Sequence, residues 1–202
     1  MDSLTILIIR HAEKPGRAWP GPGLTIDGVK DKKSLVIRGW QRAGAWAALF
    51  SHHRGGDDFP RPDVIYAANP NAPGATSTAA TDAADDEDAP SQRPFETVTP
   101  LAARLKQTVN AEFAQGAERG LAEAVVKLSG VVLIAWEHKH IISDLLPDIA
   151  GGQKLPLPHD WPGERFDVVL RFDRAKPGKD WKFKQLFPKL LSGDSDTPLP
   201  TT

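Results

Sequence analysis

Two histidines and two arginines in this sequence have the residue types and the placement needed to bind and transfer a phosphoryl group. Arg10 and His11 directly follow one apolar run, His138 follows another, and Arg93 lies between them in the sequence. Guanidinium groups bind the non-bridging phosphoryl oxygens two at a time, and a neutral imidazole nitrogen can attack phosphorus to form a phosphohistidine. A second, cationic histidine can stabilise the charge on these oxygens in the transition state. The set predicts phosphoryl-transfer chemistry that needs no metal ion and no cofactor.

Predicted strands of a parallel sheet position these side chains. Three short segments read as strands, and the first and last are the continuous apolar runs typical of buried parallel strands: 4–9 (LTILII), 63–67 (DVIYA) and 131–136 (VVLIAW). Ligands of such sheets bind at the edge formed by the carboxyl ends of the strands. We therefore expect His11 and His138 to meet at this edge, with Arg93 able to reach it from the segment after the second strand.

The remaining patterns complete an α/β domain. Apolar spacing and helix-start signals predict four helices: 38–50, 91–105 after a turn and with an interruption at Pro100, 120–128 and 141–149. Alternating residues around a Lys-Pro-Gly-Lys turn predict an antiparallel hairpin over 166–172 and 181–187. This order of elements predicts a three-layer α/β sandwich with a mostly parallel central sheet and a C-terminal antiparallel hairpin. We expect a single domain over 1–202, with long loops near 14–34 and 68–90 and a frayed tail from about 192.

Composition limits the possible classes of function. Hydrophobic residues make up 40% of the 202 residues, which suffices for the core of one domain. A formal net charge of −1 predicts no general attraction to nucleic acid or to an anionic membrane. The absence of cysteine excludes disulfides and thiolate chemistry. Without a predicted membrane helix or signal peptide, we expect a cytoplasmic protein, and its oligomeric state stays open.

Four segments in order resemble the motifs of the histidine phosphatase superfamily, also called phosphoglycerate-mutase-like, in its small-cap branch. The segments are LIIRHAEK (7–14), IRGWQRA (37–43), SQRPFET (91–97) and the strand ending in His138. Ala12 stands where this family usually has glycine. The resemblance implies that His11 accepts the phosphoryl group, that Arg10 and Arg93 clamp the phosphate, and that His138 completes the pocket.

The resemblance also implies a carboxylic acid that protonates the leaving group. Glu112 is the first candidate, although its surroundings do not match the family motif. Glu13 is close to His11 in the sequence. Glu137 precedes His138, but a side chain one residue back on a strand should face the other way. An enzyme without a dedicated acid, like the smallest members of the family, is the alternative.

Several functions remain open from the sequence. The first is hydrolysis of phosphomonoesters or of phosphohistidine, with a phosphorylated small molecule or a phosphoprotein as substrate. The others are a phosphoglycerate-type mutase and a catalytically weak module that binds phosphorylated ligands. His140 could form a metal pair with His138, but no further cluster shows ligand spacing, so no metal site is predicted. Lys14 and Arg17 are candidates for contacts with a phosphorylated substrate.

Overall fold

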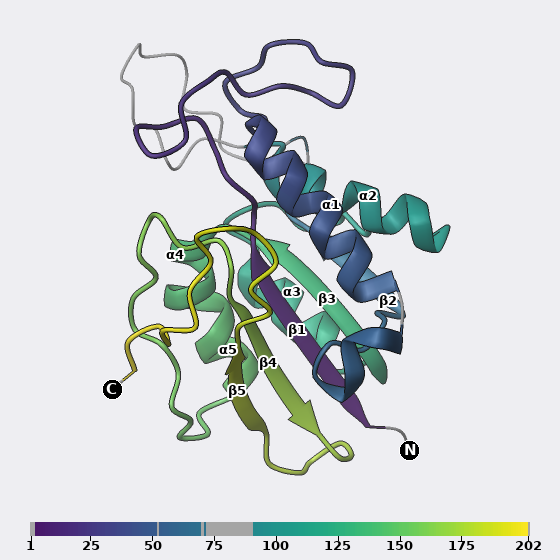
Figure 1. Cartoon of the computed structure of the whole chain (residues 1–202). Coiled ribbons are helices and arrows are strands. Elements are labelled where there is room, and N and C mark those ends of the chain that lie inside the picture. The colour runs from purple at the N-terminus through teal and green to yellow at the C-terminus, as the bar shows by residue number, and fades with distance from the viewer. Residues whose placement is uncertain (1–2, 52, 70, 72–90, 202) are drawn as a thin grey trace.

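The chain is built around a five-stranded sheet in the computed structural model, which describes residues 3–51, 53–69, 71 and 91–201. The strands lie in the order β2-β3-β1-β4-β5, which places the first strand in the middle of the sheet (Figure 1). They are β1 (Leu4–Arg10), β2 (Val64–Ala67), β3 (Gly130–Trp136), β4 (Val169–Arg174) and β5 (Lys182–Leu186).

The directions of the strands confirm the predicted fold class. β1 and β2 both run parallel to β3, whereas β4 is antiparallel to β1 and β5 is antiparallel to β4. In the β1–β3 pairing Arg10 lies opposite Trp136, so the two strands end level with each other. The residues that follow them, His11 and Glu137, therefore start from the same edge of the sheet.

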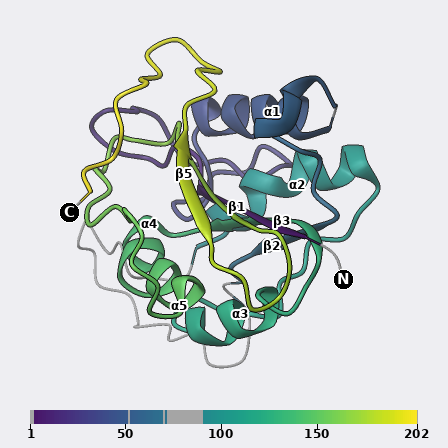
Figure 2. The ribbon, with the colours of Figure 1, turned by 90° about the horizontal axis from the view of Figure 1, so that it is seen from below.

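Helices cover both faces of the sheet and give the three-layer sandwich that the sequence predicts (Figure 2). The helical elements are α1 (Ile37–Ser51), α2 (Arg93–Leu105), α3 (Glu118–Val125), α4 (His138–His140), α5 (Leu146–Ala150), the 3-10 turn η1 (His53–Asp58) and the π-helical turn η2 (Ile141–Leu145). Side chains of β1 alternate between two cores: Leu7 and Ile9 pack with Trp46 of α1, whereas Ile6 and Ile8 pack with residues of α3 and α5. No helix in the described ranges is long and apolar enough to cross a membrane.

The interruption expected at Pro100 does not occur. Pro94 occupies the first turn of α2, and the helix continues through Pro100 to Leu105. Beyond this proline the buried face of α2, with Leu101 and Ala102, packs in the core that also holds α1 residues. We attribute the continuation to this burial of apolar surface, which offsets the hydrogen bond that proline cannot donate.

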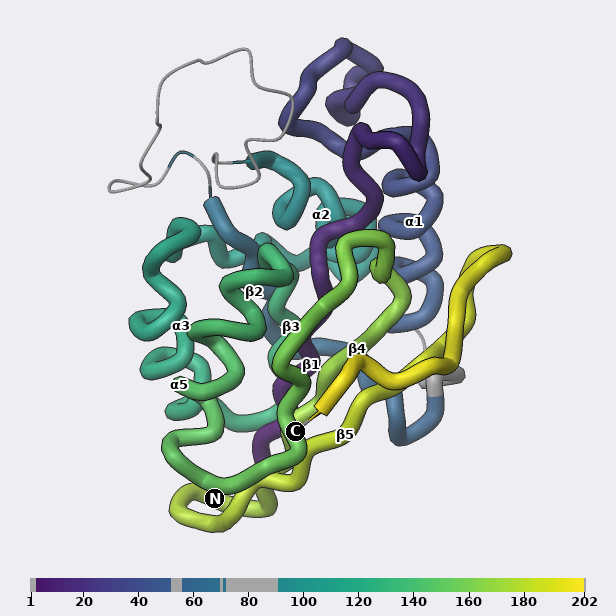
Figure 3. Tube along the Cα trace, turned by 90° about the vertical axis from the view of Figure 1, so that its left-hand side faces the viewer, coloured from purple at the N-terminus to yellow at the C-terminus, as the bar shows by residue number. Residues whose placement is uncertain are grey.

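The helical segment after β3 begins earlier than predicted. It starts at His138 rather than at Ile141, continues through η2 and ends at Ala150. Glu137 is the N-cap residue, with an extended backbone, and its carboxylate accepts hydrogen bonds from the backbone N–H groups of Lys139 and His140 at 2.7 and 3.1 Å. An acidic cap satisfies N–H groups that no helical carbonyl reaches, so Glu137 stabilises the early start. Figure 3 shows α5 at the end of this segment beside α3.

The tail was expected to be frayed, but it packs against the body of the protein. Asp194 forms an ion pair with Arg42 of α1 at 2.7 Å, Leu199 is buried, and Thr201 forms an isolated β-bridge with Pro158. These specific contacts stabilise a segment whose polar, proline-containing sequence suggests disorder. The predicted loop over 14–34 is irregular, with one β-bridge between Leu24 and Lys30, whereas most of the loop predicted at 68–90 lies outside the described residues.

Candidate active site

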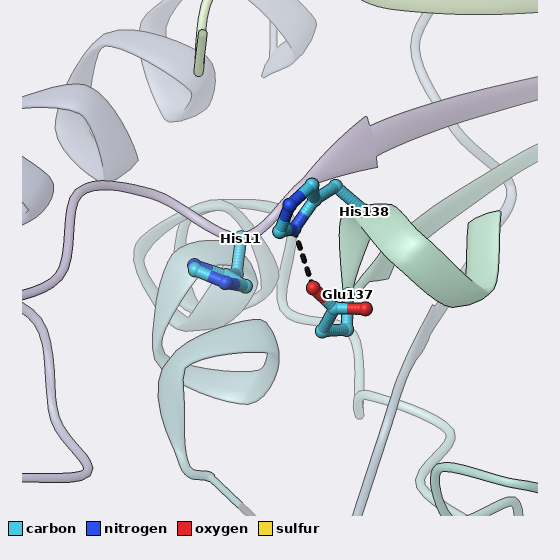
Figure 4. A group of neighbouring side chains, drawn as sticks. All are labelled: His11, Glu137 and His138. Carbon is cyan, nitrogen blue, oxygen red and sulfur yellow. Dashed lines mark ion pairs between the residues drawn. The ribbon is translucent and has the colours of Figure 1, made fainter. Parts of the chain in front are cut away.

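The carboxyl edge of the sheet brings His11, Glu137 and His138 together. Each offers a side-chain nitrogen or oxygen, and these atoms all lie within 4.8 Å of one another. All three residues are buried. In Figure 4, His11 extends from the end of β1, while Glu137 and His138 come from the junction of β3 and α4. Residues separated by more than a hundred positions in the sequence thus form one cluster.

A hydrogen bond to the backbone fixes the tautomer of His11. Its Nδ1 lies 2.8 Å from the carbonyl oxygen of Ala12, which can only accept, so Nδ1 carries the proton. Burial lowers the pKa of His11 well below 6.5, and the positive charges of Arg10, Arg93 and His138 lower it further, against the Ala12 hydrogen bond, which raises it. The imidazole therefore stays neutral even below pH 6.5. Its Nε2 keeps a lone pair, which is the form a nucleophile requires.

Arg10 is fixed in position beside His11 by the segment before β4. Its Nη1 donates to the carbonyl oxygens of Pro162, Gly163 and Arg165 at 3.2, 2.8 and 3.1 Å. Its guanidinium carbon lies 4.1 Å from the ring centroid of Phe166, and the same ring lies 5.9 Å from that of His11. The arginine is fully buried, so little water screens its charge from His11.

Arg93 is the first residue of α2 and approaches the cluster from the face of the sheet that α1 and α2 cover. Its Nη2 donates to the carbonyl oxygen of Lys32 at 2.7 Å, and its charge is one cause of the lowered pKa of His11. One turn later, the hydroxyl of Thr97 donates to the carbonyl oxygen of Arg93 and accepts from the backbone N–H of Ala12 at 2.8 Å. Thr97 thus fixes α2 to the residue after His11.

Glu137 is the site residue that the sequence analysis placed incorrectly. It was expected to face away from His138, as a neighbour in a continuing strand would. The strand ends at Trp136 and the helix begins at His138, so the backbone turns at Glu137 and its carboxylate contacts Nδ1 of His138. Burial alone would raise the pKa of Glu137, but hydrogen bonds from His138 and from two backbone N–H groups outweigh it and lower the pKa. Glu137 is therefore an ionised partner of His138.

The other two candidate acids lie elsewhere. Glu112 is exposed, and its carboxylate accepts from the side-chain amide of Asn110 at 3.4 Å. Glu13 is fully buried and pairs with Arg42, whose Nη2 lies 2.8 Å from its Oε1. The structure thus brings His11, Arg10, Arg93 and His138 together, but it shows no contact of Glu112 with them among the described residues.

Glu13 fixes the loop after His11 to α1. Arg42 contacts Glu13 on one side and Asp194 on the other, and all three side chains are almost inaccessible to solvent. The backbone of Glu13 also passes close to α1: a Cβ atom on Gly39 would lie 2.5 Å from the Glu13 carbonyl oxygen. Only glycine allows this approach, which explains the Arg-Gly-Trp motif at the start of α1.

Comparison with known proteins supports the fold. No family model matches the chain, and no curated protein sequence matches it. Among solved structures, a protein described as mycobacterial hydrolase 2 has a TM-score of 0.50 and 12% identity, over 91% of this chain and 90% of its own. A protein from Agrobacterium tumefaciens, assigned as the phosphohistidine phosphatase SixA, has a TM-score of 0.45 and 14% identity, over 91% of this chain and 97% of its own. At such low identity the first likeness shows a shared α/β fold along nearly the whole chain.

Proposed function

We propose that this protein is a metal-independent phosphatase that hydrolyses phosphomonoesters or phosphohistidine through a phosphohistidine on His11. The observation that carries this proposal is the state of His11, a buried neutral imidazole whose Nδ1 donates to the Ala12 carbonyl. Its Nε2 is left with a lone pair, and Arg10, Arg93 and His138 act on it from three elements of the fold. A neutral nucleophile surrounded by positive groups suits attack on an anionic phosphoryl group.

The proposed reaction has two steps on the same nitrogen. Nε2 of His11 attacks phosphorus, a nitrogen–phosphorus bond forms, and the bond from phosphorus to the leaving oxygen or nitrogen breaks. The leaving atom keeps the electron pair and takes up a proton. A water molecule then attacks the phosphohistidine, its oxygen bonds to phosphorus, and the electron pair of the nitrogen–phosphorus bond returns to Nε2. The water gives up its proton, and inorganic phosphate leaves.

The positive residues have separate roles in this proposal. Arg10 and Arg93 bind the non-bridging oxygens, whose charge persists through the transition state. His138 donates from Nε2 to the same group while Glu137 accepts from its Nδ1. The ionised Glu137 carboxylate contacts Nδ1 of His138 and so fixes the direction of its ring.

The weakest assignment in this proposal is the acid that protonates the leaving group. The lowered pKa of Glu137 keeps this residue ionised, so it is not a proton donor. The carboxylate of Glu13 is engaged in the buried ion pair with Arg42. Glu112 remains the candidate that the sequence offers, although it lies in the solvent-exposed loop before α3. Without an efficient acid, the site favours substrates whose leaving group departs readily, such as aryl phosphates and phosphohistidine.

Hydrolysis is a better proposal than the mutase alternative. A mutase must enclose its intermediate so that water does not take the phosphoryl group. Between α2 and α3, residues 106–117 form no separate cap. They are hydrogen bonded to the end of β2, through the carbonyl of Asn110 to the N–H of Ala67 and the carbonyl of Phe113 to the N–H of Asn69. Efficient interconversion of phosphoglycerates by the purified protein would favour the mutase instead.

Trapping the phosphoenzyme tests the proposal directly. Wild-type protein mixed with radiolabelled phosphoramidate and quenched in alkali should carry a label that is stable to base and labile to acid. Mass spectrometry should place the label on His11, and a chelator such as EDTA should not reduce it. Turnover of the substrate with no label under any quench condition would point to direct attack by water and overturn the covalent intermediate.

Replacing Glu137 with glutamine should lower kcat/KM for p-nitrophenyl phosphate by about tenfold to a hundredfold. A hydrogen bond to a charged partner contributes about 1.5–3 kcal/mol, and about 1.4 kcal/mol corresponds to a factor of ten. Glutamine can still accept from the backbone N–H groups of α4 but lacks the negative charge that Glu137 presents to Nδ1 of His138. Inhibition by inorganic phosphate should weaken in parallel.

Glu112→Gln is the matched control, since it makes the same chemical change on an exposed side chain. This variant should retain the wild-type kcat/KM if Glu112 is not the acid. A large loss in Glu112→Gln with none in Glu137→Gln would assign the essential carboxylate to Glu112 and contradict our assignment.

A further inference from the structure

A second cluster of side chains joins α3 to the helical segment that starts at His138. It consists of Glu118 from α3, His140 from α4 and Asp144 from η2, whose ligand atoms all lie within 4.8 Å of one another. We propose that this cluster binds a divalent metal ion and that its chemistry fits Zn²⁺. The site is separate from His11 and plays no part in the proposed reaction.

Two of the three distances in the cluster match those between ligands of one small cation, and the third lies within 4.8 Å. Nδ1 of His140 lies 3.4 Å from Oε1 of Glu118 and 3.2 Å from Oδ2 of Asp144. Ligands about 2.0–2.2 Å from a tetrahedral zinc ion are separated by about 3.3–3.5 Å. One imidazole and two carboxylates are also a donor set that zinc accepts, with a fourth position left for water.

Glu118 is held in the orientation that a ligand needs. Its side chain is almost inaccessible, and Oε1 accepts from the indole N–H of Trp136 at 2.8 Å and from the backbone N–H of Gly116 at 2.9 Å. These hydrogen bonds hold the carboxylate in place before any ion binds. Because they use both lone pairs of Oε1, an ion would bind Oε2 of Glu118 or displace one of these hydrogen bonds.

The helix places the other two ligands on one face and leaves the site accessible. His140 and Asp144 are four residues apart, so their side chains lie on the same side of the helix. His140 is 29% exposed and Asp144 is 47% exposed, so an ion can enter from solvent. The neighbouring Arg119 is turned outward, where it pairs with Glu123 at 3.2 Å. The two carboxylic side chains supply the negative charge that a divalent cation requires.

Metal bound at this position would connect α3 to the helical segment that begins with His138. The wide π-helical turn η2 starts directly after His140, and turns of this kind occur frequently at functional sites. Binding to the folded state alone raises stability. We therefore expect the ion to stabilise the segment that carries His138 without taking part in phosphoryl transfer.

Calorimetric titration of the whole chain with ZnCl₂, in buffer free of phosphate and chelator, tests the proposal. Wild-type protein should bind one zinc ion per chain, and saturating zinc should raise its midpoint of thermal unfolding. His140→Ala should abolish binding at this site, and Asp144→Asn, at an exposed position, should weaken it at least tenfold. Co²⁺ in place of zinc should give the visible absorption of a tetrahedral site, and His140→Ala should remove it.

Two control variants distinguish this site from other zinc-binding groups. Glu137→Gln alters the cluster around His11, and His159→Ala removes an exposed histidine elsewhere, so both should retain wild-type zinc affinity. Zinc binding that persists in His140→Ala but disappears in Glu137→Gln would place the ion at the His11 cluster and overturn the proposal. No binding by the wild-type protein would show that the three side chains form an ion-pair cluster only.

Discussion

The His11→Ala variant is expected to hydrolyse p-nitrophenyl phosphate more than about a thousandfold more slowly than the wild-type protein. The loss should appear in kcat, because alanine removes the nitrogen that forms the covalent bond but leaves Arg10 and Arg93 to bind the phosphate. The matched measurement is the affinity for inorganic phosphate, which should change far less than the rate. Steady-state kinetics and competitive inhibition on the same preparation give both values.

The fold of His11→Ala should persist, and a control should show that the effect is local. The ring of His11 contacts Phe166 at the edge of the sheet, so its removal leaves a small cavity outside the two main cores. His159→Ala, at an exposed position, should keep the full rate. Activity close to wild type in His11→Ala would exclude this histidine as the phosphoryl acceptor, whereas no activity in either protein would favour a module that binds phosphorylated ligands.

The Arg42→Ala variant is expected to lose about 3–5 kcal/mol of the free energy of unfolding, which is typical when one partner of a buried ion pair is removed. Glu13 has no solvent access, and after the substitution Arg38 still lies near it, with Nε at 3.4 Å. Asp194 loses its partner as well, and its lowered pKa depends on hydrogen bonds from Arg42 and from the backbone, which outweigh burial. Urea denaturation, followed by circular dichroism, measures the loss as a lower midpoint.

Two further variants separate the charge from the packing. Arg119→Ala removes an arginine from an exposed pair with Glu123 and should leave the midpoint unchanged. The double variant Glu13→Gln with Arg42→Met removes the charges of Glu13 and Arg42 and leaves that of Asp194. It should recover part of the loss, because no uncompensated charge remains on Glu13. A double variant less stable than Arg42→Ala would show that packing of the Arg42 side chain dominates.

The sequence was sufficient to predict the fold class and the edge of the sheet at which His11 and His138 meet. Both depend on local patterns, since an apolar run of β-branched residues predicts a buried strand wherever it lies in the chain. The change from strand to helix at Glu137 was missed because it depends on the residue at which β3 ends, and boundaries are the least certain part of such predictions. Once the boundary is known, an acidic residue before a helix is an ordinary cap signal.

The contacts that hold the site residues in place were not predictable from local patterns. Glu13 was considered as an acid because it is close to His11 in the sequence, whereas the structure pairs it with Arg42. Asp194 lies in a segment with the composition of a disordered tail, and its contact with Arg42 depends on how α1 packs. Such pairings are set by tertiary structure, and a single sequence contains no signal for them.

The contacts that support His11 have a consequence for how the protein folds. Arg10 and Gly163 are separated by 153 positions, and Arg42 and Asp194 by 152. Contacts across such separations form late, because closing a long loop costs chain entropy before the contact repays it. The sheet belongs to the same late stage, because β1 pairs with β4 through Leu4 and Arg174. In refolding from urea, the helical circular dichroism signal should therefore recover before hydrolysis of p-nitrophenyl phosphate does, and simultaneous recovery would contradict this order. During folding the protein would pass through a stage that has local helices but cannot yet catalyse the proposed reaction.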